Sequence, residues 1–180
     1  MNRLQKLIDI SYIQYNISPL IKYIPNYIIK LYIKCNPNKY YEFGFIYQFY
    51  YKNYELMHEC YNKAIDEESN SNAMCKLGYY YQYTEYNYDL MKKYYLDAIA
   101  LGNSSAILRL GYHYDEIETN YDLMKKYYGD AIVLCYIYAM NNLGWYYQYT
   151  DKNYDLMKKY YIMAIKLGEA NLVLHLLHLI

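Results

Sequence analysis

The sequence has no excess of charge of either sign. Its 18 lysine and arginine residues equal its 18 aspartate and glutamate residues, so its formal net charge at pH 7 is +0. A nucleic-acid-binding protein usually carries a basic excess or a basic face. A protein held electrostatically at a membrane also needs a basic segment. The balance therefore predicts no nucleic-acid partner and no membrane anchor of this kind.

Closely spaced cysteines are missing too. The four cysteines are Cys35, Cys60, Cys75 and Cys135, no two form a C-x-x-C pair, and the shortest spacing is 15 residues. Disulfide frameworks of secreted proteins are denser, and structural zinc sites use paired cysteines. We therefore expect reduced thiols that pack in the interior, and neither a metal nor a cofactor.

Long apolar runs are absent as well. Asp9 interrupts the apolar stretch near the N-terminus, and no small-residue cleavage site follows it. No segment reaches the roughly 18 uninterrupted apolar residues of a transmembrane helix. The sequence therefore predicts neither a signal peptide nor a membrane span, and we expect a cytoplasmic protein.

What the sequence does contain is an internal repeat. The phrase NYDLMKKYY begins at Asn87, Asn120 and Asn153, and a variant, NYELMHECY, begins at Asn53, with successive spacings of 34, 33 and 33 residues. Two further markers recur in the same register: Leu-Gly, which is Phe-Gly in the first copy, and Ala-Ile. Three markers in one register indicate a single structural unit that occurs four times.

Each repeat predicts two helices, as residues 72–102 illustrate. In the first half, Ala73 and Tyr81 fall on one helical face. A glycine in the middle of this helix costs about 1 kcal/mol relative to alanine, so we expect the partner helix to approach closely there. Asn87 is a good N-cap for the second half, and Gly102 follows its last turn as a C′ glycine should. The short connection between the halves requires an antiparallel pair.

The chain is therefore predicted to be all-α, a right-handed α-solenoid of stacked antiparallel helix pairs. Its four repeats are expected at 39–68, 72–102, 105–135 and 138–168. Residues 1–38 are expected to form an N-terminal helical cap or a degenerate repeat, with one helix over 27–35. Residues 169–180 begin a further first helix, which we expect to cap the last pair as a C-terminal half-repeat.

The repeat pattern, A-x-x-x-L-G-x-x-Y followed by Y-Y-x-x-A-I-x-x-G, resembles the Sel1-like repeat, a relative of the tetratricopeptide repeat. In the second repeat the matching residues are Ala73, Leu77, Gly78, Tyr81, Tyr94, Tyr95, Ala98 and Gly102. The inter-helix loop lacks the Sel1 glycines and is about three residues shorter, which brings the period close to the tetratricopeptide value of about 34. Near-identical copies rich in tyrosine, asparagine and isoleucine are also similar to repeat proteins encoded by large DNA viruses of amoebae. That similarity implies a location in the host cytoplasm.

The family resemblance implies a candidate binding site. In tetratricopeptide-like stacks, the face of the first helices opposite the core lines a concave groove. Here that face carries Phe45, Gln48 and Phe49; Tyr79, Gln82 and Tyr83; Tyr112, Asp115 and Glu116; and Trp145, Gln148 and Tyr149. Tyrosine and tryptophan are enriched at interface hot spots, and the single tryptophan of the chain is in this set. Because the chain has 33 tyrosines, composition alone could also place tyrosine here.

No motif indicates catalysis. The sequence contains no Gly-rich phosphate loop, nucleophile elbow or metal-ligand spacing. His175 and His178 could lie on one helical face, but no carboxylate or thiol lies nearby in the sequence to complete a metal site. Lysine pairs such as Lys158 and Lys159 recur in every second helix except the first, and aspartates one turn away offset them. We interpret these lysines as a solvated outer face.

We therefore predict a protein-interaction scaffold or adaptor that binds a protein or peptide partner in the aromatic groove, and not an enzyme. The alternative is a structural protein that assembles into homo-oligomers through the apolar residues 170–180. RNA binding is disfavoured by the neutral charge, because helical repeats that bind RNA normally present a basic surface. Catalysis is disfavoured because no convergent polar site interrupts the repeat.

Overall fold

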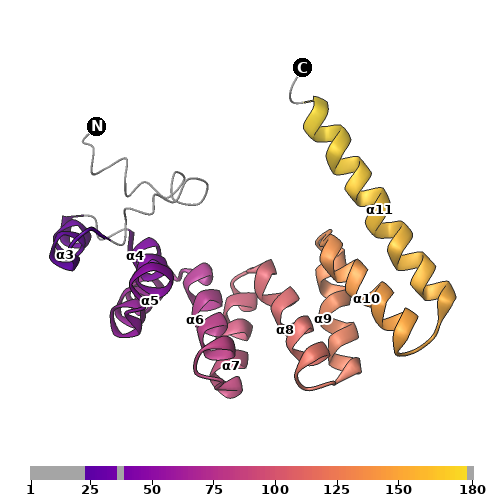
Figure 1. The fold of residues 1–180 in the computed structure, drawn as a ribbon, viewed down its shortest axis with the longest axis horizontal. Coiled ribbons are helices and arrows are strands. Elements are labelled where there is room, and N and C mark those ends of the chain that lie inside the picture. Colours follow the sequence, from indigo (N-terminus) through magenta and orange to yellow (C-terminus); the bar gives the residue numbers. More distant parts are fainter. Residues whose placement is uncertain (1–22, 36–38, 178–180) are drawn as a thin grey trace. The chain divides into compact units, whose positions relative to one another are not determined.

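A computed structural model describes residues 23–35 and 39–177 of the chain, and the side chains of 23–34 and 39–168 among them (Figure 1). Within these residues the chain forms nine α-helices and one short π-helix, and it contains no β-strand. The all-α prediction is therefore confirmed. The chain divides into two compact units, the first ending at Tyr94 and the second beginning at Tyr95.

The first unit holds the helices of the first repeat and those on either side of it. They are α3 (Asn26–Cys35), α4 (Tyr40–Ile46), the π-helix η3 (Tyr47–Tyr51), α5 (Tyr54–Glu68), α6 (Ser71–Tyr83) and the first half of α7 (Tyr88–Ala100). α4 packs on α5, α5 packs on α6, and α4 also contacts α6. The first helices of two consecutive repeats therefore lie beside each other within this unit.

The second unit holds the remaining helix pairs. After the second half of α7 come α8 (Ser104–Glu116), α9 (Tyr121–Val133), α10 (Ile137–Tyr149) and α11 (Tyr154–Leu177). α8 packs on α9, α9 on α10, and α10 on α11. The helices therefore pair in sequence order, as the repeat predicts.

Asparagine side chains begin most of these helices. In six of the described helices, the asparagine Oδ1 accepts a hydrogen bond from the backbone N–H three residues later, at 3.0–3.2 Å. The six residues are Asn53, Asn70, Asn87, Asn103, Asn120 and Asn153. Each bond satisfies one of the backbone donors that a helix leaves unpaired at its first turn. The predicted cap at Asn87 is thereby confirmed.

In three repeats, the recurring glycine of the first helix makes room for a tyrosine ring of the second helix. A Cβ atom on Gly111 would lie 2.5 Å from Cδ1 of Tyr128, and one on Gly144 would lie 2.7 Å from Cε1 of Tyr161. Gly44 has the same relation to the ring packed on it in the first repeat. A methyl group does not fit at such distances. The prediction that the glycine lets the partner helix approach closely is therefore confirmed in these three repeats.

A stacked pair of tyrosines joins the two helices in three of the four repeats. The pairs are Tyr81 with Tyr94, Tyr114 with Tyr127 and Tyr147 with Tyr160, with ring centroids 5.5–5.6 Å apart and interplanar angles of 3–7°. Stacked aromatic pairs contribute about 0.5–1.5 kcal/mol beyond the area that they bury. In the first repeat the equivalent positions are Tyr47 and Cys60, so this stack is missing there.

Positive backbone φ angles recur with the same period as the sequence repeat. Positive φ angles follow the second helix at Ser69, Gly102 and Cys135, and they lie between the helices at Lys52, Tyr86, Thr119 and Lys152. Successive members of each group are 33 or 34 residues apart. Only Gly102 is a glycine, with φ of 80°, so the turns keep one geometry although their residues change.

The end of the fourth repeat differs from the prediction. The sequence predicts that Gly168 ends the second helix and that a separate capping helix begins at 169. Instead, α11 runs through Gly168 without interruption to Leu177. Gly168 does not adopt the positive φ with which Gly102 ends α7, and helix-forming residues follow it directly. The predicted break at Gly168 is therefore wrong.

The N-terminal prediction is met in part. The helix expected over 27–35 is confirmed as α3, and it packs on the first repeat, because Ile29 is buried in the core and the ring of Tyr32 meets that of Phe43 edge-on at 5.8 Å. The choice between a cap and a degenerate repeat depends on residues 1–22, which lie outside the described residues.

Candidate functional site

Four of the predicted groove residues form one aromatic cluster in the first unit. The ring centroids of Phe45 and Phe49 are 4.6 Å apart, those of Phe49 and Tyr79 6.4 Å, and those of Tyr79 and Tyr83 4.6 Å. The cluster runs from α4 and η3 to α6, so it joins the first helices of two repeats. Its outermost ring, that of Tyr83, is 40% exposed.

Two lysines border this cluster. The Nζ atom of Lys76 lies 5.2 Å from the ring centroid of Phe45 and 5.4 Å from that of Phe49, and Nζ of Lys52 lies 5.9 Å from Phe49. A cation over an aromatic face is attracted by the ring quadrupole, typically by about 0.5–1 kcal/mol at an exposed site. The cluster therefore combines aromatic surface with positive charge at its edge.

The second unit exposes more of its predicted groove residues. Tyr112 is 41% exposed, Trp145 50% and Tyr149 58%. The rings of Trp145 and Tyr149 lie side by side on α10, with centroids 5.2 Å apart. Glu116, at the end of α8, is also exposed. Together with Tyr83 of the first unit, these four residues are the exposed members of the predicted site.

The glutamines of the first two repeats are not on the surface. Gln48 is 4% exposed and Gln82 is 1% exposed, although both were expected to line the groove. In the first repeat the reason is a hydrogen bond within the helix pair: the hydroxyl of Tyr61 donates to Oε1 of Gln48 at 2.9 Å. Buried polar groups are normally paired in this way. These two glutamines are therefore part of the interior.

The same hydrogen bond recurs in the second unit. The hydroxyl of Tyr128 donates to Oδ2 of Asp115 at 3.2 Å, and that of Tyr161 donates to Oε1 of Gln148 at 3.1 Å. Each of these tyrosines also lies over the glycine one turn earlier on the first helix. We call this arrangement the tyrosine lock. In it, the ring of a tyrosine on the second helix packs on a glycine of the first helix, and the tyrosine hydroxyl donates to the polar residue four positions after that glycine.

The lock sets the environment of the one carboxylate among these acceptors. Desolvation by burial raises the pKa of Asp115 above its ordinary value, the hydrogen bond from Tyr128 opposes that rise, and the neighbouring Glu116 adds to it. The pKa of the Tyr128 phenol is also raised, because the phenol is buried and the Asp115 carboxylate lies close to it. Tyr128 and Asp115 therefore form a structural hydrogen bond between the two helices of the pair.

The recurring lysines of the second helices lie over the stacked tyrosines. Nζ of Lys93, Lys126 and Lys159 lies 5.7, 5.2 and 5.5 Å from the ring centroid of the tyrosine that follows each. All three lysines are exposed. These lysines are therefore solvated, as the sequence predicts, with an added cation–π contact in each of these repeats.

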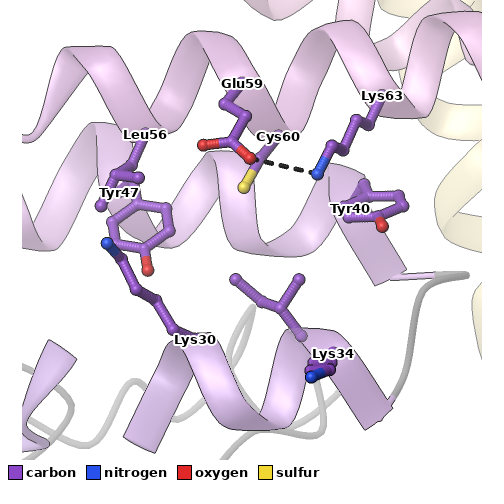
Figure 2. Close-up of a pocket in the computed structure, with 9 residues that line it drawn as sticks. Lys30, Lys34, Tyr40, Tyr47, Leu56, Glu59, Cys60 and Lys63 are labelled. Atoms are coloured by element: carbon purple, nitrogen blue, oxygen red, sulfur yellow. Dashed lines mark hydrogen bonds and ion pairs between the residues drawn. The ribbon is translucent and has the colours of Figure 1, made fainter. Parts of the chain in front are cut away.

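A pocket of about 320 Å³ in the first unit was not predicted (Figure 2). It lies between α3 and the α4–α5 pair, and its lining residues are Lys30, Ile33, Lys34, Tyr40, Tyr47, Leu56, Glu59, Cys60 and Lys63. Repeat analysis missed it because α3 precedes the repeats. The available signal was Cys60, which stands where the other repeats have a stacked tyrosine.

Cys60 and Cys75 are buried as predicted, Cys135 is exposed, and no disulfide joins these three described cysteines. Among the described residues, no group of three or more His, Cys, Asp or Glu side chains could hold a metal ion. His175 and His178 lie outside the described side chains. No described helix is both long enough and apolar enough to cross a membrane.

Comparison with known proteins adds no relative. The sequence matches no family model and has no significant match among curated proteins.

Proposed function

We propose that the chain is a protein-interaction scaffold that binds a protein or peptide partner through the exposed aromatic residues of its first helices. Its framework would be a right-handed α-solenoid of Sel1- and tetratricopeptide-like helix pairs. The 33–34-residue period, the repeated asparagine caps and the repeated turn angles support this framework, because each repeat then presents its first helix in the same way.

The observation that carries the proposal is the pair formed by Trp145 and Tyr149. Both rings are at least half exposed and they lie side by side on one helix. Large aromatic side chains bury much area at low entropic cost when a partner covers them, and tryptophan and tyrosine dominate interface hot spots. An exposed tryptophan beside an exposed tyrosine is therefore a strong candidate for a contact point.

The tyrosine lock supports the proposal by fixing these rings before binding. Trp145 directly follows Gly144, and Tyr149 directly follows Gln148. Gly144 and Gln148 are the two residues held by Tyr161. Because the backbone under both rings is anchored to α11, little ordering should be left for the binding step, and preorganisation of this kind raises affinity.

The first unit offers a second contact region of the same kind. The aromatic cluster of Phe45, Phe49, Tyr79 and Tyr83 has lysines at its border. A partner segment with apolar side chains and neighbouring acidic groups would complement it. The overall charge balance disfavours a nucleic-acid partner for either region.

The single tryptophan makes the proposal directly testable. Peptides would be selected against the intact chain from a random display library and then titrated in solution. Binding at the proposed site should shift the emission of Trp145 to shorter wavelength and protect it from iodide quenching. Trp145→Ala should weaken binding by about 2 kcal/mol or more while leaving the helical circular dichroism unchanged.

The control is the double variant Lys158→Ala, Lys159→Ala on the outer face of α11. Exposed charges contribute little to such contacts, so this variant should bind as the wild type does. If the lysines proved essential and Trp145 dispensable, the binding surface would have to be moved to the second helices. If no peptide bound but light scattering showed homo-oligomers, the self-assembly alternative would replace the proposal.

A further inference from the structure

The pocket beside α3 arises where the first repeat departs from the other three. At the position of Tyr94, Tyr127 and Tyr160 the first repeat has Cys60. Tyr47, the equivalent of the stacking partner, is fully buried, and its hydroxyl donates to Oδ1 of Asn26 at 2.8 Å. The missing ring leaves space, and the walls of that space include Tyr47 and Cys60 (Figure 2).

The charges around this pocket depart from the repeat as well. Lys63 stands where the next two repeats have Asp97 and Asp130, and Glu59 stands where the others have lysine. The two side chains form an ion pair of 3.1 Å at the pocket rim. Both residues belong to α5, the helix in which Cys60 replaces the stacked tyrosine, so the changes of charge and the missing ring occur on the same helix.

α3 supplies the other charges. Lys30 and Lys34 are one helical turn apart, both are exposed, and both line the pocket from the side opposite α5. Of the nine described lining residues, three are lysines and one is a carboxylate, which leaves two positive charges in excess. Because Glu59 already pairs with Lys63, that excess lies with the α3 lysines.

The remaining walls are apolar or aromatic. Ile33 and Leu56 contribute aliphatic surface, Tyr40 and Tyr47 contribute rings, and Cys60 contributes its sulfur. Desolvation by burial raises the pKa of the Cys60 thiol to about 12, so this wall is neutral at physiological pH. A pocket of about 320 Å³ falls at the lower end of the range for small-molecule sites.

We propose that this pocket binds a small organic anion, in which an apolar body carries a phosphate or carboxylate group. The body occupies the space that the missing tyrosine ring leaves between Tyr47, Leu56 and Cys60. The anionic group lies at the rim, where Lys30 and Lys34 donate to its oxygens. The pocket uses none of the residues of the aromatic contact regions, so this site is independent of partner binding.

Four probes test the ligand class on the intact chain by NMR titration and calorimetry. Phenyl phosphate and hexanoate each combine an apolar body with one anionic group, and they distinguish a phosphate from a carboxylate ligand. Benzyl alcohol lacks the charge and inorganic phosphate lacks the body. Saturable binding of either organic anion, with much weaker binding of the other two probes, is expected. Equal binding of inorganic phosphate, or no saturation by either organic anion, would overturn the proposal.

Two charge variants should move the affinity in opposite directions. The double variant Lys30→Ala, Lys34→Ala removes the donors and should weaken binding about tenfold, as expected for the loss of a charged hydrogen bond. Glu59→Gln removes the only carboxylate among the described lining residues and should tighten binding about threefold. All three positions are exposed, so the fold should be unaffected. Unchanged affinity in the lysine variant would contradict the site.

The charge-matched control is again Lys158→Ala, Lys159→Ala, which lies in the other compact unit and should bind as the wild type does. A third variant, Cys60→Tyr, restores the ring that the other repeats carry. It should fill the pocket, stack on Tyr47 and abolish binding while the circular dichroism spectrum is retained. Retained binding in a folded Cys60→Tyr chain would show that the ligand lies elsewhere.

Discussion

Among single residues, Tyr128 shows how one side chain holds several helices together. Its ring lies against Gly111 of α8, and its hydroxyl donates to Asp115 of the same helix. The same oxygen accepts a hydrogen bond from Nδ2 of Asn142 on α10 at 2.9 Å. Tyr128 therefore joins its own helix, α9, to the helix before it and the helix after it.

This arrangement predicts opposite effects for two Gly-to-Ala substitutions in one repeat. Gly111→Ala places a methyl group 2.5 Å from the ring of Tyr128, and overpacking of this kind typically costs about 1–3 kcal/mol. Gly129→Ala meets nothing within 4 Å and lies inside helix α9, so it should stabilise the fold by up to about 1 kcal/mol.

Urea unfolding followed by circular dichroism at 222 nm measures both effects. Gly129→Ala is the matched control, because it makes the same chemical change on the other helix of the pair. Equal midpoints for the two variants would show that the glycine at position 111 is not needed for the packing of Tyr128.

The role of the recurring glycine could be predicted from the sequence, whereas the burial of two glutamines was missed. The recurring glycine predicted the close approach because glycine inside a helix costs about 1 kcal/mol and this one occurs at the same position of all four repeats. The burial of Gln48 and Gln82 was not predicted, because the groove residues were assigned from the family resemblance, although each glutamine lies one helical turn after the recurring glycine. The partner of Gln48 is the hydroxyl of Tyr61 on a different helix, and helical periodicity does not identify such a partner.

For whole helices, the first residue of each helix was easier to predict than the last. An asparagine cap is a local interaction between residues three positions apart, and the sequence displays it directly. The end of a second helix depends on whether the residue that follows it adopts a positive φ, and Gly102 does so whereas Gly168 does not. The π-helix η3 and the pocket beside α3 involve the one repeat that departs from the pattern, so the pattern could not predict them.

The cap of α9 gives a prediction at this scale. Asn120→Ala removes the side-chain oxygen that accepts from the backbone N–H of Leu123, and it should lower the free energy of unfolding by about 1 kcal/mol. Asn120→Asp keeps an acceptor and adds negative charge at the helix N-terminus, so its stability should match or exceed that of the wild type. Thermal unfolding of the three proteins decides the point, and equal losses in both variants would show that the side-chain oxygen does not cap the helix.

For the whole molecule, the tyrosine content has a consequence for pH that no single repeat displays. Tyr61 and Tyr128 are fully buried in different units, and desolvation raises the pKa of both phenols above the ordinary value of about 10. Burial likewise raises the pKa of the buried Tyr47 and Tyr80. Many groups in both units therefore share one direction of pKa shift.

We predict that the fold is lost at alkaline pH. Above pH ~10 the unfolded chain releases its phenolic protons whereas the folded chain keeps those of the buried tyrosines, so the unfolded state binds fewer protons. Stability is then fully present below pH ~10 and falls as pH rises, by about 1.4 kcal/mol per pH unit for each such tyrosine. Cys60, whose pKa is raised to about 12, adds to the loss in the same range.

The measurement is a titration from pH 8 to 12 that records helical circular dichroism together with tyrosinate absorbance at 295 nm. Exposed tyrosines should ionise first with the helices intact, and the buried ones should ionise only as the helical signal disappears. In Tyr128→Phe, the fall of stability between pH 10 and 12 should be less steep, because one buried phenol has been removed. Ionisation of all 33 tyrosines near pH 10 in a chain that stayed helical would show that water reaches the buried hydroxyls without unfolding, and the tyrosine lock could not then be a closed interior contact.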